Sequence, residues 1–291
     1  MLWVDAFHQS PALLYGTALT LGLIVGSFLN VVILRLPRMM EAQWQRECAE
    51  LTGSPDAAAP NPEPNLIRPG SRCPACGHAI RPWENIPLLS FLILRGRCSA
   101  CRSPIGLRYP LVEALTGILT LVAVWHFGLS WQALAALPLT WGLVALAFID
   151  YDTQLLPDDI VLPLLWLGLL LSLAALFADP RSAIVGAAAG YVILWAVFHV
   201  FRLLTGKEGM GYGDFKLLGM LGAWLGWQLL PQIVLVSALA GAVLGTLLIA
   251  SGRHERGTPM PFGPFLAVAG WIALIWGPAI NDWYLRLSGL G

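Results

Sequence analysis

Residues 231–251, PQIVLVSALAGAVLGTLLIAS, form a run of 21 residues without one charged side chain. A run of about 20 apolar residues is long enough to cross the hydrocarbon core of a bilayer as a single helix. Similar runs recur near residues 11–34, 110–128, 131–149, 160–178, 182–204, 214–229 and 261–281. The chain is 57% hydrophobic and 12% charged, whereas globular domains are about 25% charged. The sequence therefore predicts an all-α membrane protein, a polytopic bundle of about eight transmembrane helices.

The basic residues are distributed unevenly between the predicted loops. Alternate loops on one side hold fifteen lysines and arginines, and the opposite side holds only Arg181 and Arg286. Basic residues mark the cytoplasmic side of a membrane protein. The long loop after the first span is therefore expected in the cytoplasm and both termini on the periplasmic side. The first span has no basic residues before it, so it is expected to be an anchor and not a cleaved signal peptide.

Three regions follow from this pattern: an N-terminal transmembrane helix (1–34), a cytoplasmic loop (35–109) and a seven-helix membrane core (110–291). In the loop, residues 39–51 have the pattern of a short surface helix. Residues 52–70 carry five prolines, which is typical of an extended linker. The remainder of the loop contains two Cys-x-x-Cys pairs.

The two pairs are Cys73/Cys76 and Cys98/Cys101, with 21 residues between them, slightly more than most zinc sites have. Four thiolates suit a closed, tetrahedral, structural zinc site. Disulfides are disfavoured in the reducing cytoplasm, although a redox dithiol and metal-free thiols stay open. We predict a small zinc-binding domain in which zinc supplies much of the folding free energy, with His78 a bystander.

Carboxylates are rare elsewhere, so each one can be weighed. Asp150 ends an apolar run, where a charge is costly within a span and such residues usually carry function. Asp152 lies in the following turn, and Asp158 and Asp159 precede the next span, where helix capping accounts for at least one of them. Asp214 follows three spaced glycines and begins another span.

The glycines in GMGYGDFKLL (209–218) permit unusual backbone angles and close approach of another chain. Capping of the following helix is the competing explanation for Asp214. Lys216, two residues later, would not face Asp214 on a helix, and we expect it to extend to the lipid headgroups.

Two carboxylates at one membrane boundary can share a proton, so that one activates water while the other hydrogen-bonds a peptide carbonyl. This is aspartyl-protease chemistry. A proton-coupled transporter could use the same residues, and a membrane thiol oxidoreductase could use the cysteines. Zincin, Gly-x-Ser-x-Gly, phosphate-loop and dinucleotide-binding motifs are absent from the sequence, and nothing in it suggests nucleic-acid binding.

GYGDFKLL resembles the Gly-x-Gly-Asp signature of intramembrane aspartyl proteases. DYDTQLLPD is similar to the first aspartate motif of that family, in which a proline follows the aspartate by seven residues, as Pro157 follows Asp150. Together with the four-cysteine loop and IGLRYPLVE, these motifs resemble the bacterial type IV prepilin peptidases over nearly the whole chain. The resemblance implies that Asp150, and not Asp152, pairs with Asp214, supported by Gly211, Gly213, Pro157 and Lys216.

The resemblance also implies the substrates. They would be prepilins and type II secretion pseudopilins, cut after the glycine of the leader at the cytoplasmic face of the inner membrane. Members with the four-cysteine loop N-methylate the new N-terminus using S-adenosylmethionine. Candidate residues for that second activity are Glu84, Asn85, Gly96 and Arg108. The stretch PMPFGPF (259–265) is similar to the family's entry to the last span and is expected near the site.

Overall fold

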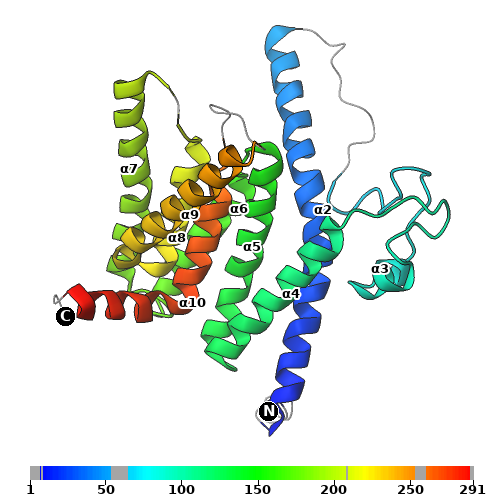
Figure 1. Ribbon diagram of the computed structural model, residues 1–291, viewed down its shortest axis with the longest axis horizontal. Helices are drawn as coiled ribbons and strands as arrows, with labels where there is room; N and C mark the ends of the chain where they lie inside the picture. The colour runs from blue at the N-terminus through cyan, green and yellow to red at the C-terminus, as the bar shows by residue number, and fades with distance from the viewer. Residues whose placement is uncertain (1–6, 8, 54–64, 208, 253–259, 289–291) are drawn as a thin grey trace. The chain divides into compact units, whose positions relative to one another are not determined.

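The computed structural model describes residues 7, 9–53, 65–207, 209–252 and 260–288, and these residues are mainly helical (Figure 1). No strand forms within these ranges, which contain only two isolated β-bridges. The chain divides into two compact units, residues 1–129 and 130–291. The all-α prediction is confirmed.

The first unit is built on two packed helices, α2 (Pro11–Thr52) and α4 (Arg108–Phe127). Glycine lets their backbones approach, since a Cβ added to Gly26 would lie 2.8 Å from the Cα atom of Glu113. Small residues at such crossings are the usual solution for helices in membranes. The Asn30 amide on α2 donates a hydrogen bond to the Tyr109 carbonyl at 3.1 Å, which fixes the start of α4 against α2.

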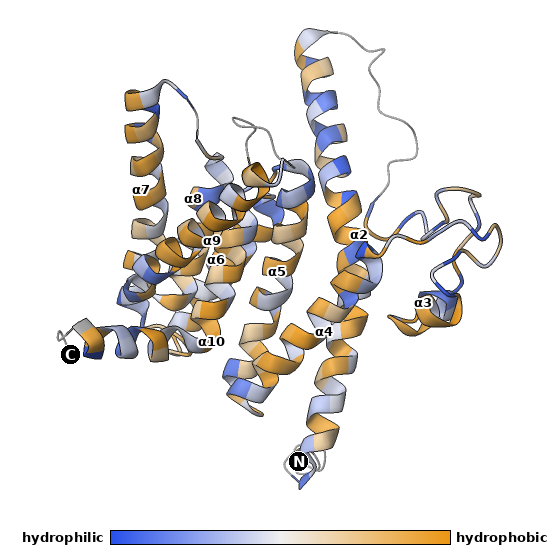
Figure 2. Ribbon diagram, viewed as in Figure 1, coloured by the Kyte–Doolittle hydropathy of each residue, from blue (hydrophilic) through white to orange (hydrophobic). Residues whose placement is uncertain are grey.

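Helix α2 differs from the prediction. The expected surface helix at 39–51 is not separate, because α2 continues from the first span to Thr52 and passes through Pro37. Its 42 residues give a length of about 63 Å, and its last turns are rich in polar residues (Figure 2). Most of the predicted linker, residues 54–64, lies outside the described residues.

The cysteine segment forms a small subdomain that contains the 3-10 helix η2 (Pro82–Asn85) and the one-turn helix α3 (Leu89–Ile93). Two tight turns, which we call the knuckles (residues 71–80 and 96–105), flank these elements. Each knuckle carries one Cys-x-x-Cys pair and is closed by one of the two β-bridges.

The described part of the second unit contains six helices and one short 3-10 turn, η3 (Trp227–Leu229). In chain order the helices are α5 (Trp131–Thr153), α6 (Asp158–Ser172), α7 (Pro180–Thr205), α8 (Tyr212–Leu225), α9 (Leu230–Ala250) and α10 (Gly263–Ser288). Helix α8 is at the centre, with eleven of its 14 residues buried, and it packs against α6, α7 and α10. Helix α9 keeps apolar side chains on its surface, as a lipid-facing helix does (Figure 2).

Glycine backbones make the packing of α7 on α8 possible. A Cβ atom on Gly222 would collide with the carbonyl oxygen of Gly186, and one on Gly190 would lie 2.5 Å from the carbonyl oxygen of Leu218. On the other side of α8, the Trp224 indole donates a 2.7 Å hydrogen bond to the Leu164 carbonyl of α6. Helix α8 is therefore held by backbone contact and by a buried hydrogen bond.

A helix is present at each of the eight predicted spans, and within the described residues six helices are long and apolar enough to cross a membrane. Helices α6 and α8 have 15 and 14 residues, and at 1.5 Å per residue they extend only about 21–23 Å. Both begin next to the aspartate motifs.

Candidate active site and candidate metal site

Asp150 lies in the last turn of α5 with 5% of its surface exposed. Its Oδ2 atom accepts a hydrogen bond of 2.9 Å from the backbone N–H of Gly263, the first residue of α10. A buried carboxylate needs such donors, because burial without them is costly. The stretch at 260–265 therefore reaches this aspartate, as the sequence suggested, while Pro259 lies outside the described residues.

Asp214 lies in the first turn of α8 and is likewise 5% exposed. Its Oδ2 atom accepts a hydrogen bond of 3.1 Å from the N–H of Gly211, the residue that caps the helix. Asp214 is therefore not the N-cap residue; it is the third residue of the helix, and one of its oxygens accepts the N–H of the residue that is. The other oxygen, Oδ1, is buried and has no hydrogen-bond partner among the described residues. A buried oxygen without a donor goes beyond what a cap requires.

The two aspartates belong to one site in the second unit, because Gly213, next to Asp214 in the chain, and Gly263, which contacts the Asp150 carboxylate, lie against the same side chain. The Leu156 side chain lines this site from the α5–α6 turn. A Cβ on Gly213 would lie 2.7 Å from Leu156 Cβ, and one on Gly263 would lie 3.2 Å from Leu156 Cδ2. Glycine at both positions lets the segment that carries Asp214 and the start of α10, which binds Asp150, close around one leucine.

Pro157 caps the start of α6, so that neither Asp158 nor Asp159 is the N-cap residue. Both lie in the first turn, where the helix dipole favours negative charge. The expectation for Lys216 is wrong, because its Nζ atom lies 2.8 and 2.7 Å from the two carboxylate oxygens of Asp158 instead of extending to headgroups. This ion pair joins the first turns of α6 and α8.

The four cysteines of the first unit form a candidate metal site, with all Sγ atoms within 4.8 Å of one another. The Sγ atoms of Cys73 and Cys101 are 3.8 Å apart. Four sulfurs arranged tetrahedrally at about 2.3 Å from a zinc ion lie about 3.8 Å apart. The donor set and its spacing therefore fit a structural zinc ion, and the four-thiol cluster can bind a metal.

The electrostatics of the thiols also favour a cation. Backbone N–H groups of Cys76 and Ala75 lower the pKa of Cys73 to about 6. An N–H of His78 acts in the same direction on Cys76, but the neighbouring thiols, Cys101 first, raise the pKa of Cys76 to about 12. Four thiolates repel one another, and a divalent cation removes that repulsion.

The knuckles are two copies of one motif, 25 residues apart in the sequence. SRCPACGHAI (71–80) and GRCSACRSPI (96–105) share five residues in register. The hydrogen bonds repeat as well, since Cys73 N–H donates to the His78 carbonyl and Cys98 N–H to the Ser103 carbonyl, each at 2.9 Å. This internal repeat is visible in the sequence, and it would have strengthened the metal-site prediction.

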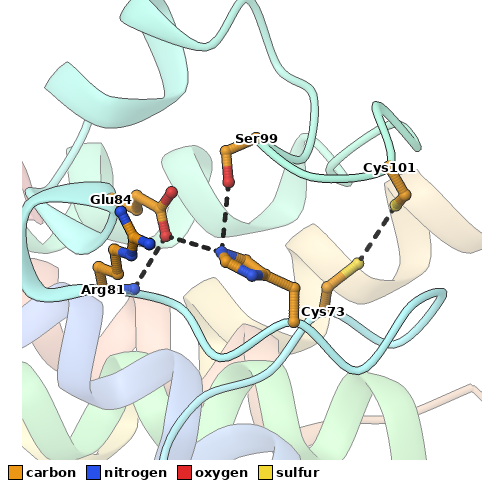
Figure 3. A network of polar contacts seen from close by, with 6 residues as sticks. Cys73, Arg81, Glu84, Ser99 and Cys101 are labelled. Carbon is orange, nitrogen blue, oxygen red and sulfur yellow. Dashed lines mark hydrogen bonds and ion pairs between the residues drawn. The ribbon is translucent and has the colours of Figure 1, made fainter.

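His78 lies outside the four-thiol cluster, but it is not a bystander. Its Nε2 atom lies 3.3 Å from Oε2 of Glu84 and 3.4 Å from Oγ of Ser99, two residues labelled in Figure 3, so it joins the two knuckles directly and also holds η2. Glu84 also accepts a hydrogen bond from the Arg81 N–H, and this bond, followed by those of Ser99 and His78, lowers the pKa of Glu84 to about 2.

The candidates for methyl transfer are placed around this subdomain. Glu84 holds η2 and His78, and Gly96, with a φ of 65°, packs beneath the Phe91 ring. Asn85 is exposed beside Glu84, and Arg108 begins α4. The hydrogen bonds and packing of Glu84 and Gly96 are thus already used to fold the subdomain.

Sequence reasoning missed Glu113, a carboxylate within the α4 span that is buried against α2. Its Oε2 atom accepts a 2.8 Å hydrogen bond from the N–H of Leu88, just before α3. An acidic residue inside an apolar run was the available signal, and it is the signal that identified Asp150.

Each of the two units matches a known protein family over most of its length. Residues 20–127 match the Bacterial Peptidase A24 N-terminal domain, and residues 137–246 match the Type IV leader peptidase family. No solved structure matches the chain.

Full-length relatives carry one name. The chain is 57% identical to the Prepilin leader peptidase/N-methyltransferase of Stutzerimonas stutzeri over 99% of both chains. It is 55% identical to the protein of that name from Pseudomonas aeruginosa over 98% of both, and 53% identical to the one from Aeromonas hydrophila over 98% of both. These similarities confirm the resemblance drawn from the motifs.

Proposed function

Because this chain belongs to the type IV leader peptidase family, we propose that it cleaves the leader peptide from type IV prepilins and type II secretion pseudopilins. We propose aspartyl-protease chemistry for this cleavage, with Asp150 and Asp214 as the catalytic pair. The observation that carries the assignment is the meeting of two buried carboxylates, from α5 and α8, in one site.

The hydrogen bonds of the site suggest which oxygen of each carboxylate is held in place and which one takes part in the reaction. One oxygen of each carboxylate is held by a backbone N–H, of Gly263 for Asp150 and of Gly211 for Asp214. These donors orient the side chains and leave the opposite oxygens for chemistry. The buried Oδ1 atom of Asp214 is suited to hold water or the scissile carbonyl. The ionised carboxylate takes a proton from the attacking water, and the protonated one donates a hydrogen bond to the peptide carbonyl.

The depth of the site suits the substrate. Asp150 is at the end of a span, and Asp214 is at the start of a short buried helix, so both lie near a membrane boundary. We place this boundary at the cytoplasmic face of the bacterial inner membrane, from the distribution of basic residues. A prepilin whose leader precedes an apolar helix would present its cleavage site at that depth.

The proposal extends to the ligands of the first unit. We propose that Cys73, Cys76, Cys98 and Cys101 hold a zinc ion, which would fix the two knuckles and take no part in cleavage. We also propose N-methylation of the new N-terminus, from the name of the relatives, with S-adenosylmethionine as the donor. Asn85 and Arg108 are the candidates to contact this donor, since Glu84 and Gly96 are used in the subdomain fold.

The gathering of all four thiols in one cluster does not favour two separate redox dithiols. A thiol oxidoreductase would also keep its activity without the aspartates, whereas a leader peptidase would not. Substitution of the two aspartates therefore distinguishes a leader peptidase from a thiol oxidoreductase.

The test is cleavage of a purified prepilin by Asp150→Asn and Asp214→Asn variants, with product mass as the readout. Each variant is expected to insert and fold but to lose activity by about 10²- to 10⁴-fold, the scale of general acid–base catalysis. Asp152→Asn is the matched control, because Asp152 is exposed and two residues from Asp150. Normal cleavage by either of the first two variants would refute the pair.

A further inference from the structure

The segment between the two knuckles presents an apolar surface that the fold of the first unit leaves uncovered. We call residues 80–95 the interknuckle segment; it contains η2 and α3. Leu92 and Ile93 on α3 are each 70% exposed, and the other exposed apolar side chains are those of Ile80, Trp83, Ile86 and Leu89. Much of the segment is apolar in Figure 2. Six exposed apolar side chains on one short segment of a small subdomain mark a contact site.

A hydrogen bond fixes this segment to the membrane span α4. The backbone N–H of Leu88 donates to Glu113 Oε2 at 2.8 Å, and Leu88 holds a positive φ of 58° to do so. Few residues other than glycine adopt such a φ. The Glu113 carboxylate is buried, so without this donor a charged group inside the span would lose a direct partner. The attachment of α3 to α4 is therefore built into the fold.

This attachment sets the depth of the segment in the membrane. Helix α4 begins at Arg108 and Tyr109, residue types that mark the interface between bilayer and water. Glu113 is five residues further on, about 7.5 Å along the helix axis. Amphipathic segments that lie on membranes bury their apolar face about 5–10 Å into the boundary between headgroups and acyl chains. A segment fixed to Glu113 lies in that zone.

The charges of the surrounding chain complement an anionic membrane surface. Residues 65–112 contain seven arginines and a single carboxylate, Glu84, which is engaged by His78 and the Arg81 N–H. Arg81 stacks on Trp83 at 5.5 Å, a pairing of cation and amphipathic ring that suits the headgroup layer. The next helix, α4, also presents Leu111, Leu115 and Ile118 on its surface, as a lipid-facing helix does.

We infer that the interknuckle segment is a further membrane-contacting element of the first unit, besides the spans α2 and α4, which inserts the apolar side chains of α3 into an anionic bilayer surface beside the start of α4. The metal site holds the segment from both ends. Glu113 holds it from the side of the span. The arginines lie at the headgroups, where anionic lipid attracts them.

Photo-crosslinking of the full chain in nanodiscs tests this inference. Leu92 is replaced with the photoreactive residue p-benzoyl-L-phenylalanine, the protein is irradiated in phosphatidylcholine–phosphatidylglycerol nanodiscs, and adducts are identified by mass. The matched control carries the same residue at Leu51, which is 89% exposed and lies sixteen residues beyond Arg35 on α2, about 24 Å along the axis. Position 92 is expected to give at least fivefold more lipid adduct than position 51.

Other outcomes overturn the inference. Adducts from position 92 to residues 130–291 or to a second copy would show that protein covers the segment, and equal lipid labelling at positions 92 and 51 would show no insertion. Adding Glu113→Leu to the position-92 variant is expected to lower lipid labelling to the control level, whereas Glu113→Gln, which keeps an acceptor, is expected to preserve it. Unchanged labelling in the leucine variant would refute the role of Glu113.

Discussion

Replacing Gly263 with alanine adds one methyl group at the point where α10 meets Asp150. That Cβ would lie 2.7 Å from Asp150 Oδ2, whereas ordinary van der Waals contact begins near 3.4 Å. The carboxylate must therefore retreat by about 0.7 Å, the difference between these two distances. Alanine is the better helix former, so any loss of activity comes from this contact and not from the helix.

The retreat works against the hydrogen bond that orients Asp150. A shift of about 0.7 Å along this 2.9 Å bond would lengthen it beyond hydrogen-bonding distance. Hydrogen bonds to charged groups contribute about 1.5–3 kcal/mol, and each 1.4 kcal/mol corresponds to a factor of ten in rate. We therefore expect Gly263→Ala to lower kcat for prepilin cleavage by about 10- to 100-fold, with KM within about twofold, because the substrate-binding surface is unchanged.

The assay is steady-state cleavage of purified prepilin by protein in nanodiscs, with the thermal unfolding midpoint measured in parallel. Gly241→Ala is the control, since a Cβ there meets the Phe265 ring at an ordinary 3.6 Å, and its kcat should stay within about twofold of the parent. If both variants cleave at the same rate and unfold at the same temperature, Gly263 does not position Asp150. A loss confined to KM would contradict the argument equally.

Three further outcomes are expected. Gly222→Ala should lower the unfolding midpoint far more than Gly241→Ala, because its methyl group collides with the Gly186 carbonyl of α7; equal midpoints would contradict the packing. Replacing any one of the four cysteines with serine, or treating the protein with a strong chelator, should release about one zinc ion per chain by elemental analysis while prepilin cleavage persists, and a preparation without zinc would refute the metal assignment. Lys216→Glu should reduce cleavage by about fivefold, since exposed ion pairs contribute up to about 1 kcal/mol, and Asp158→Lys in the same chain should recover part of the loss. No effect of the single change would show that the pair does not position α8.

The helices could be predicted from the sequence because a bilayer imposes a simple requirement on length and polarity. Their ends could not. Helix α2 continues through Pro37 to Thr52, since its later turns are still good helix formers and need no lipid contact. Helices α6 and α8 are shorter than the predicted spans. They pack against each other inside the second unit, and this packing, not the thickness of the bilayer, sets their lengths.

The site was predictable only as far as local motifs reach. Asp150 and Asp214 are each marked by charge beside an apolar run, and the structure brings them into one site. The N–H of Gly263 and the ion pair of Lys216 with Asp158 join residues 113 and 58 positions apart. No local pattern encodes such separations. Glu113 was detectable by the same signal as Asp150, and it is the last residue of IGLRYPLVE, but that motif by itself does not show that its carboxylate binds the N–H of Leu88.

Because each knuckle supplies two of the four cysteines, one metal ion bound by both knuckles would close a loop of the chain. A metal ion bound by the four cysteines would join Cys76 to Cys98 across 21 residues, and closing a loop of that size costs about 3 kcal/mol in chain entropy. The free energy of metal binding would offset this entropy cost. The bound ion would keep the interknuckle segment in its folded conformation, and without the ion the segment would collapse or aggregate. Loss of the metal, or oxidation of one thiol, would then unfold the interknuckle segment. The metal concentration and the redox state of the cell would therefore set how tightly this segment binds the bilayer.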